Sequence, residues 1–232
     1  MPATAVLRQQ SRVLALAAVA LPLAVAVVDD VRVRRHLNAA RRDPLTGLTG
    51  RDTLTARIEQ LARAHRDLLH VLVADADGLK AVNDTLGHAA GDSLIAAVGH
   101  RLGTWAQTRG GLAVRLGGDE FGAAVLLPPA ASLREVTALH ALLAQPVDHD
   151  RRILRDADGQ VLHPAVSIGT ARAVDLPDAA DASRLLRGAD MAMYRVKTRA
   201  KPLGYVANRH DAYTPTVHGR RPGRPGTHLP VA

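Results

Sequence analysis

Residues 115–121 read RLGGDEF, and apolar runs at residues 112–116 and 121–127 flank the two glycines. Paired glycines between apolar runs are typical of a tight β-hairpin turn, because glycine takes positive φ without a steric cost. Asp119 and Glu120 follow at once, so the expected turn carries two adjacent carboxylates. Gly117 and Gly118 place no side chain between the backbone and a ligand. The stretch therefore predicts a hairpin with an acidic turn.

A second acidic pair, Asp75 and Asp77, follows the nearly continuous apolar run of residues 68–74. Such a run is consistent with a strand buried on both faces. If this strand neighbours the hairpin, Asp75, Asp119 and Glu120 converge. Two carboxylates about 4 Å apart repel by about 4 kcal/mol at an effective dielectric near 20, so the cluster needs a cation or raised pKa values. The chain has no cysteine, and oxygen ligands favour Mg²⁺ or Mn²⁺, which pair with phosphate substrates.

The remaining pattern alternates helices and strands. Apolar residues at helical spacing indicate helices, and apolar runs between turn residues indicate strands. The helix that begins at residue 52 takes its start from Asp52 or Thr53, and the next is entered from Gly91. The order predicts one α/β or α+β domain, with a central mixed β-sheet flanked by helices. The helices are expected at residues 52–65, 92–103, 132–144 and 182–199, and the further strands at 152–155, 161–170 and 203–206.

Lysine is rare in this chain, which has three lysines among its 30 basic residues. Lys80 lies five residues after Asp75, and Lys197 and Lys201 are one turn apart on the last expected helix. That spacing puts both ammonium groups on one face, where they can hold a triphosphate. The alternative is that the two lysines are ordinary surface residues.

Composition excludes several other classes of protein. The 232 residues allow one ordinary domain with extensions. Only 2% are aromatic, which argues against modules that stack nucleic-acid bases. The net charge of +8 lies in the two ends, residues 1–42 and 207–232, and residues 43–206 are neutral. We therefore expect no nucleic-acid-binding face. No P-loop motif GxxxxGK is present.

Residues 13–28 contain no charged or hydrogen-bonding side chain, and arginines flank them on both sides. This segment is a marginal transmembrane helix, because 16 residues fall somewhat short of the hydrocarbon core. The rival interpretations are a cleaved signal peptide, a soluble linker helix and a misassigned start of the chain. The arginines after the segment predict a single-pass protein of the inner membrane whose downstream part is cytoplasmic. Residues 29–42 would form a basic linker helix, and residues 207–232, rich in Pro and Gly, a disordered tail.

Several motifs share their order and spacing with one known family, and by them residues 43–206 resemble the GGDEF domain of diguanylate cyclases. These motifs are DPLTGL at 43–48, DADGLKAVNDTLGHAAGD at 75–92, GGDEF at 117–121, SIG at 167–169 and the stretch from Ala189-Asp190 to Lys197.

The resemblance implies a role for each matching residue. Asp75, Asp119 and the Ala76 carbonyl would hold the metal, Mg²⁺ or Mn²⁺, with Glu120 as a second acidic group beside it. Asp119 is also the expected proton acceptor. Asn83 and Asp92 would read guanine. The structural alternative for these two residues is a loop turn and a helix N-cap, roles that they can also serve alongside base reading. The remaining substrate-binding residues would be Gly117, Gly118, Lys80, Lys197 and Lys201.

The family reaction implied is the condensation of two GTP to cyclic di-GMP and two pyrophosphates by a homodimer, since each domain presents one GTP. Two alternatives stay open. One is a catalytically silent module that binds GTP or scaffolds a signalling partner, and the other is a related nucleotidyl cyclase or polymerase acting on another substrate. The sequence departs from the family at its inhibitory product-binding motif, where Thr108 and Gly111 stand in place of Arg and Asp.

Overall fold

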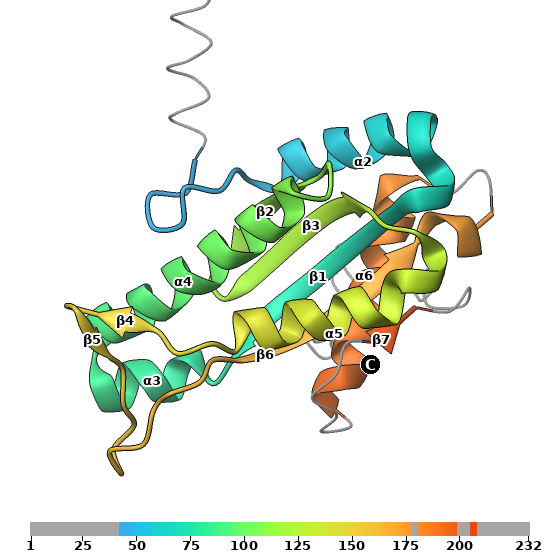
Figure 1. Ribbon diagram of the computed structural model, residues 1–232. Coiled ribbons are helices and arrows are strands. Elements are labelled where there is room, and N and C mark those ends of the chain that lie inside the picture. Colours follow the sequence, from blue (N-terminus) through green and yellow to red (C-terminus); the bar gives the residue numbers. More distant parts are fainter. Residues whose placement is uncertain (1–41, 178–180, 199–204, 208–232) are drawn as a thin grey trace, which may run out of the picture. The chain divides into compact units, whose positions relative to one another are not determined.

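The computed structural model describes residues 42–177, 181–198 and 205–207, with only the backbone of Tyr205 and Val206. Its main sheet has five strands in the order β2-β3-β1-β6-β7 (Figure 1). The strands are β1 (Leu69–Asp77), β2 (Leu112–Gly117), β3 (Glu120–Leu126), β6 (Ala165–Arg172) and β7 (Tyr205–Val206). The helices are α2 (Arg51–His65), α3 (Leu79–Leu86), α4 (His88–Gln107), α5 (Ser132–Leu143) and α6 (Ala182–Thr198), and a small hairpin pairs β4 (Asp148–His149) with β5 (Arg152–Ile153).

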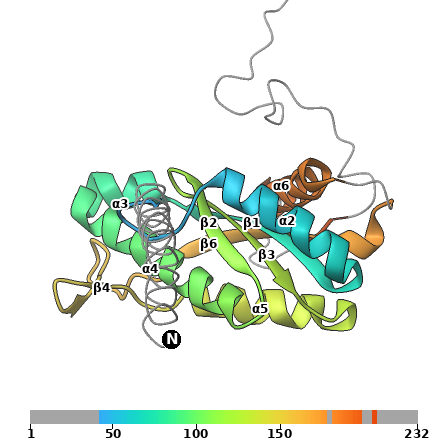
Figure 2. The ribbon, with the colours of Figure 1, turned by 90° about the horizontal axis from the view of Figure 1, so that it is seen from above.

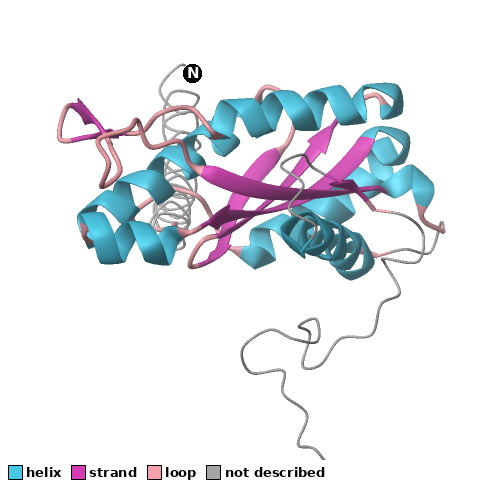
Figure 3. Ribbon diagram, turned by 90° about the horizontal axis from the view of Figure 1, so that it is seen from below, coloured by secondary structure: helices cyan, strands magenta, loops and turns pink. Residues whose placement is uncertain are grey.

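Helices cover both faces of the sheet, as Figures 2 and 3 show from opposite sides. Leu69, Val71 and Val73 of β1 belong to the core formed with α2 and α6. The alternate residues Leu72 and Ala74 belong to the core formed with α4 and α5. The expected strand buried on both faces is confirmed, and so is the mixed sheet flanked by helices.

The pairing of β1 with its two neighbours aligns the polar residues at one end of the sheet. β1 runs antiparallel to β3 with Asp75 opposite Glu120, and antiparallel to β6 with Asp75 opposite Ser167. The strand before Asp75 and the hairpin are therefore neighbours, as the convergence of their carboxylates requires. β7 is the parallel strand of the sheet, next to β6.

Several element boundaries differ from the sequence prediction, and three of these differences concern where an element begins. The helix expected from residue 92 begins at His88, so Gly91 lies inside α4, and a separate helix, α3, precedes it. Gly87 separates the two helices because its φ of 88° lies outside the helical range. The first helix has Gly50 as its N-cap and not Asp52 or Thr53. The strand expected from residue 161 begins at Ala165, and Val161 forms only an isolated bridge with Arg155.

Helix α6 lies unusually close to β6. A Cβ atom on Gly169 would be 2.0 Å from the Met193 nitrogen and 2.2 Å from the Ala189 carbonyl oxygen. The absence of a side chain at Gly169 thus lets the helix backbone contact the strand directly. Lys197 lies one helical turn beyond Met193, which brings it to the end of the sheet where Asp75 lies.

Several expectations fall on residues that the structure does not describe. The hydrophobic segment of residues 13–28, the linker helix expected after it up to residue 41, and the tail from residue 208 onward lie outside the described ranges. Among the residues that are described, no helix has the length and apolar character needed to cross a membrane.

His70 is a fully buried polar side chain in β1. Its Nδ1 lies 2.9 Å from the Leu68 carbonyl oxygen and its Nε2 lies 2.7 Å from Ser132 Oγ, at the start of α5. Burial lowers the pKa of His70 below its ordinary value of 6.5; Arg172 lowers it further, while the contact with Leu68 and the Asp175 charge oppose the shift. The folded chain therefore holds this imidazole neutral.

Because the lowered pKa belongs to the folded state, the unfolded chain takes up a proton first as the pH falls below about 6.5. We expect the free energy of unfolding to decrease from pH 7 toward pH 5, and this decrease to be smaller in His70→Gln. Chemical denaturation at several pH values measures the free energy of unfolding of both proteins. His65→Gln, at an exposed position of α2, is the matched control. An identical pH dependence in the wild-type chain and His70→Gln would contradict the assignment.

Candidate active site

Carboxylates gather where β1 meets the turn between β2 and β3. Asp75 lies opposite Glu120 in the ladder, and the Ala76 N–H donates to the Asp119 carbonyl oxygen at 3.0 Å. Asp119 and Glu120 are half-buried, whereas Asp75 is buried. The strand register thus places Asp75 beside the turn that carries Asp119 and Glu120. We call Asp75, Asp119 and Glu120 the carboxylate edge.

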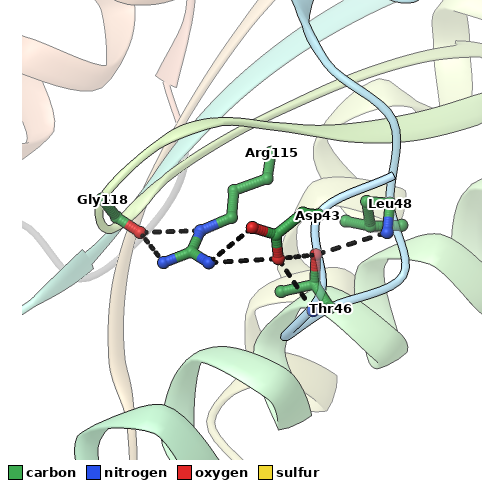
Figure 4. A network of polar contacts seen from close by, with 5 residues as sticks. All are labelled: Asp43, Thr46, Leu48, Arg115 and Gly118. Carbon is green, nitrogen blue, oxygen red and sulfur yellow. Dashed lines mark hydrogen bonds and ion pairs between the residues drawn. The ribbon is translucent and has the colours of Figure 1, made fainter. Parts of the chain in front are cut away.

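Two glycines and one arginine shape the turn that carries Asp119. Gly117 and Gly118 have φ of 147° and 55°, the positive values expected for this turn. The Arg115 Nε and Nη2 donate to the Gly118 carbonyl oxygen at 2.9 and 2.7 Å. Its Nη1 binds the Asp43 carboxylate at 2.9 Å, as Figure 4 shows. One guanidinium group therefore joins the turn to the first residues of the domain.

Asp43 is itself fixed by the loop that it begins. Its Oδ1 accepts hydrogen bonds from the backbone N–H of Thr46 at 2.8 Å and from the Thr46 hydroxyl at 2.7 Å. Burial opposes the charged form, but these bonds and the Arg115 charge lower the pKa of Asp43 below its ordinary value. Asp43 thus remains a carboxylate and presents Arg115 with a fixed anion. The sequence analysis did not select Arg115 as a site residue, although it lies only two positions before Gly117.

Lys197 reaches the carboxylate edge from α6. Its Nζ donates to Asp75 Oδ1 at 2.6 Å and lies 3.2 Å from Asp77 Oδ1. Burial raises the pKa of Asp75, and the nearby charges of Asp119 and Asp77 add to that effect, while Lys197 opposes it. Burial acts to lower the pKa of Lys197, but its bonds to Asp75 and Asp77 outweigh this and raise it. One ammonium group thus pairs with two carboxylates, those of Asp75 and Asp77.

The donor set at this edge fits a divalent cation that prefers oxygen ligands. Asp75, Asp119 and Glu120 provide carboxylates, and burial, with a smaller contribution from the charges of Asp119 and Asp77, raises the pKa of Asp75. Within the described ranges no group of three or more Asp, Glu or His side chains is placed to hold a metal ion. Mg²⁺ commonly needs only one or two protein carboxylates, because waters and substrate phosphates provide its other ligands. The residues present thus fit Mg²⁺ or Mn²⁺ together with a phosphate ligand.

The residues expected to read a base lie on a pair of helices, α3 and α4. Asn83 of α3 packs against Gly91 of α4, since a Cβ on Gly91 would lie 1.9 Å from Asn83 Oδ1. Asp92 follows Gly91 and is exposed. Asp92 belongs to the body of α4, so its expected alternative role as an N-cap is wrong. The structure therefore brings Asn83 beside the helical turn that carries Asp92.

The lysines expected to bind phosphate have different positions. Lys80 is exposed on α3, Lys197 is engaged with Asp75 as described above, and Lys201 lies outside the described residues. Asp77 and Ser167 were not selected from the sequence, yet Asp77 contacts Lys197 and Ser167 Oγ donates to Asp77 at 2.6 Å. The signal was available for Asp77, because residues two apart on a strand lie on the same face.

Gly111 stands where the family usually has the Asp of its inhibitory motif. A Cβ at this position would lie 1.9 Å from the Ala124 carbonyl oxygen of β3. Position 108 is Thr, at the C-cap of α4. An acidic side chain at position 111 therefore does not fit this backbone unless the strand moves.

The family model for the diguanylate cyclase GGDEF domain matches residues 40–202. The chain belongs to the GGDEF family. An uncharacterized 19.3 kDa protein of Streptomyces ambofaciens is 42% identical over 186 residues, which cover 80% of this chain and 93% of the relative. Diguanylate cyclase TpbB of Pseudomonas aeruginosa is 38% identical over 181 residues, covering 74% of this chain but only 38% of TpbB.

A solved structure of the GGDEF domain of TpbB matches with a TM-score of 0.60. It is 34% identical and covers 74% of this chain and 97% of the solved domain. The likeness to TpbB thus concerns the catalytic-type domain and not the whole of that protein.

The contact between Gly91 and Asn83 leads to a specific expectation. Ala is normally favoured over Gly in a helix interior by about 1 kcal/mol, so a glycine here indicates that the space is needed by Asn83. We expect Gly91→Ala to displace the Asn83 amide and to weaken GTP binding about as much as Asn83→Ala does, with the fold retained. Isothermal titration with a non-reactive GTP analogue measures the binding.

The double variant provides the control. If Gly91→Ala acts through Asn83, adding it to Asn83→Ala should weaken binding no further. Additive losses in the double variant would show that Gly91 acts in some other way.

Proposed function

We propose that this chain is a diguanylate cyclase, which condenses two GTP into cyclic di-GMP and two pyrophosphates. Membership of the GGDEF family supports the proposal. The observation that carries it is the carboxylate edge: Asp75 opposite Glu120, with Ala76 bonded to the Asp119 backbone beside a turn of two glycines. A catalytically silent module is the alternative that the experiment below tests.

In the proposed reaction the 3′ oxygen of one GTP attacks the α-phosphorus of the other, and the bond from that phosphorus to the departing pyrophosphate breaks. The same step occurs a second time in the opposite sense and closes the ring. Asp119 accepts the proton of the attacking hydroxyl. Mg²⁺ or Mn²⁺, held by Asp75, Asp119 and the Ala76 carbonyl with Glu120 beside it, would supply charge stabilisation for the attacking and leaving oxygens.

The other proposed roles concern substrate binding. Asn83 and Asp92 bind the guanine, because an amide and a carboxylate together match its acceptor and donor edges and leave adenine with unpaired groups. Gly117 and Gly118 allow phosphate to approach the backbone of the turn. Lys80, Lys197 and Lys201 provide positive charge for the phosphates.

The proposed reaction needs two copies of the chain. The product is two-fold symmetric, and one domain carries one GG turn and one Asn83/Asp92 pair, enough for one nucleotide. Two domains must therefore face each other as a homodimer. We further propose that residues 13–28 anchor the chain in the inner membrane, with the catalytic domain in the cytoplasm, and that this confinement brings the copies together.

We expect Asp119→Ala to abolish cyclic di-GMP formation from GTP and Mg²⁺ while the fold is retained, since Asp119 lies on a turn and outside both cores. Nucleotide chromatography measures the product, and circular dichroism the fold. Asp158→Ala removes a carboxylate from another, exposed turn and should leave turnover unchanged. A wild-type chain that binds GTP but forms no product would favour the silent module.

A truncated chain of residues 43–232 should bind GTP but show activity per molecule that rises with protein concentration, because its two copies meet only by diffusion. The full chain in liposomes should keep its specific activity at the same dilution, since tethering in a membrane raises the effective concentration toward about millimolar. Steady-state assays over a dilution series test this. Constant specific activity of the truncated chain down to nanomolar concentration would mean that the domain dimerises by itself.

A further inference from the structure

A line of polar contacts crosses three elements beside the carboxylate edge. Ser167 Oγ of β6 donates to Asp77 Oδ2 at 2.6 Å. The other oxygen of that carboxylate, Oδ1, lies 3.2 Å from Lys197 Nζ. Lys197 also donates to Asp75 Oδ1 at 2.6 Å. Asp77 is thus held by a different partner at each of its two oxygens.

Two positive groups can pair with the Asp75 carboxylate. It is the nearest partner of Lys197, and under the proposed function it is also a ligand of the divalent cation. Asp75 is buried, with 6% of its side chain exposed, so little water is present to screen two positive groups from each other. Lys197 therefore has to release Asp75 when a divalent cation binds there.

The Asp77 carboxylate is a second hydrogen-bond acceptor for Lys197, close to Asp75. The lysine side chain has a flexible four-carbon stem and three donors, so it can transfer its hydrogen bond from one carboxylate to the next. Because Ser167 binds Oδ2, Oδ1 stays directed at the ammonium group. Ser167 is 5% exposed and is paired with Asp75 across the ladder, which fixes its own position.

The strand register separates Asp77 from the turn. Pairing between β1 and β3 ends at Asp75 opposite Glu120, whereas pairing between β1 and β6 continues to Asp77 opposite Ala165. Asp77 thus lies two residues beyond the ladder that the carboxylate edge belongs to. Its side-chain polar contacts are with Ser167 of β6 and Lys197 of α6.

We propose that Asp77, oriented by Ser167, is a positioning residue that retains Lys197 beside the site when a divalent cation takes Asp75. The proposal rests on the proposed function in treating Asp75 as a ligand of the cation. Asp77 acts through Lys197 and is not itself a ligand. Without Asp77, the Asp75 carboxylate is the one ion-pair partner of Lys197 left among the described residues, and the lysine competes with the cation for it.

The test measures Mn²⁺ binding by the full chain, using the electron paramagnetic resonance signal of the free ion. Guanosine 5′-(α,β-methylene)triphosphate is present, because the bond at its α-phosphorus cannot release pyrophosphate. Asp77→Asn should weaken Mn²⁺ binding about tenfold, the size of loss typical of residues that orient a metal ligand. In a Lys197→Met background the same substitution should change binding by no more than about twofold, since the competing ammonium group is absent.

Two results would overturn the proposal. Equal losses with and without Lys197 would mean that Asp77 is itself a metal ligand. Unchanged binding in Asp77→Asn with Lys197 present would mean that Asp77 does not hold the lysine in the loaded site. Asp84→Asn removes an exposed carboxylate of α3 and serves as the charge-matched control, with no change expected.

Ser167→Ala gives an independent test if Asp77→Asn unfolds below the assay temperature. It removes one hydroxyl and keeps the side chain small, so we expect a smaller loss of Mn²⁺ affinity that again requires Lys197. A loss that persists in the Lys197→Met background would contradict the proposal. Since no turnover is measured, a chain without cyclase activity can still show this pattern, and an active cyclase can lack it.

Discussion

The burial of Asp75 at the end of the central strand is the constraint on which the site depends. The residue is 4% exposed, on a strand covered by helices on both faces. An ionised carboxylate in such a place is costly unless a cation compensates it. Lys197 provides that charge, but only because α6 contacts β6 directly at Gly169. One close contact between helix and strand, two ladder positions from Asp75, thus decides whether a charged group is tolerated in the sheet.

Arg115 imposes a second constraint, on the backbone. Gly117 and Gly118 are exposed and have positive φ. Because glycine has no side chain, this turn could adopt many other backbone conformations. The guanidinium group binds the Gly118 carbonyl through two nitrogens and Asp43 through the third. The planar guanidinium group can make these contacts in two directions at once, whereas the ammonium group of a lysine could not. Thr46 donates hydrogen bonds to Asp43. The position of the GG turn is therefore coupled to the loop that begins at Asp43.

The sequence predicts the parts of this fold whose signal is local. The apolar run before Asp75 and the paired glycines predict β1 and the hairpin, and adjacency of these strands is enough to bring the carboxylates together. The ion pair of Lys197 with Asp75 joins residues 122 positions apart in the chain, and no periodicity specifies it. The predicted start of α4 is wrong because it treats Gly91 as a residue that precedes a helix. In the structure Gly91 lies inside α4 and makes room for Asn83. The predictions for residues 13–28 and for Lys201 stay predictions, because the structure does not describe these residues.

The two halves of the candidate site are held by different means. The carboxylate edge belongs to hydrogen-bonded strands between two large cores, so its geometry follows the global stability of the domain. Helix α3, which carries Asn83, has no fully buried residue. It packs partly on a satellite cluster centred on Ala90, Val147 and Leu154. Regions with few buried apolar groups open at lower free energy than the core. Asn83 therefore lies on an element that opens at lower free energy than the carboxylate edge, whereas Asp92 lies on α4, which contributes to one of the two large cores.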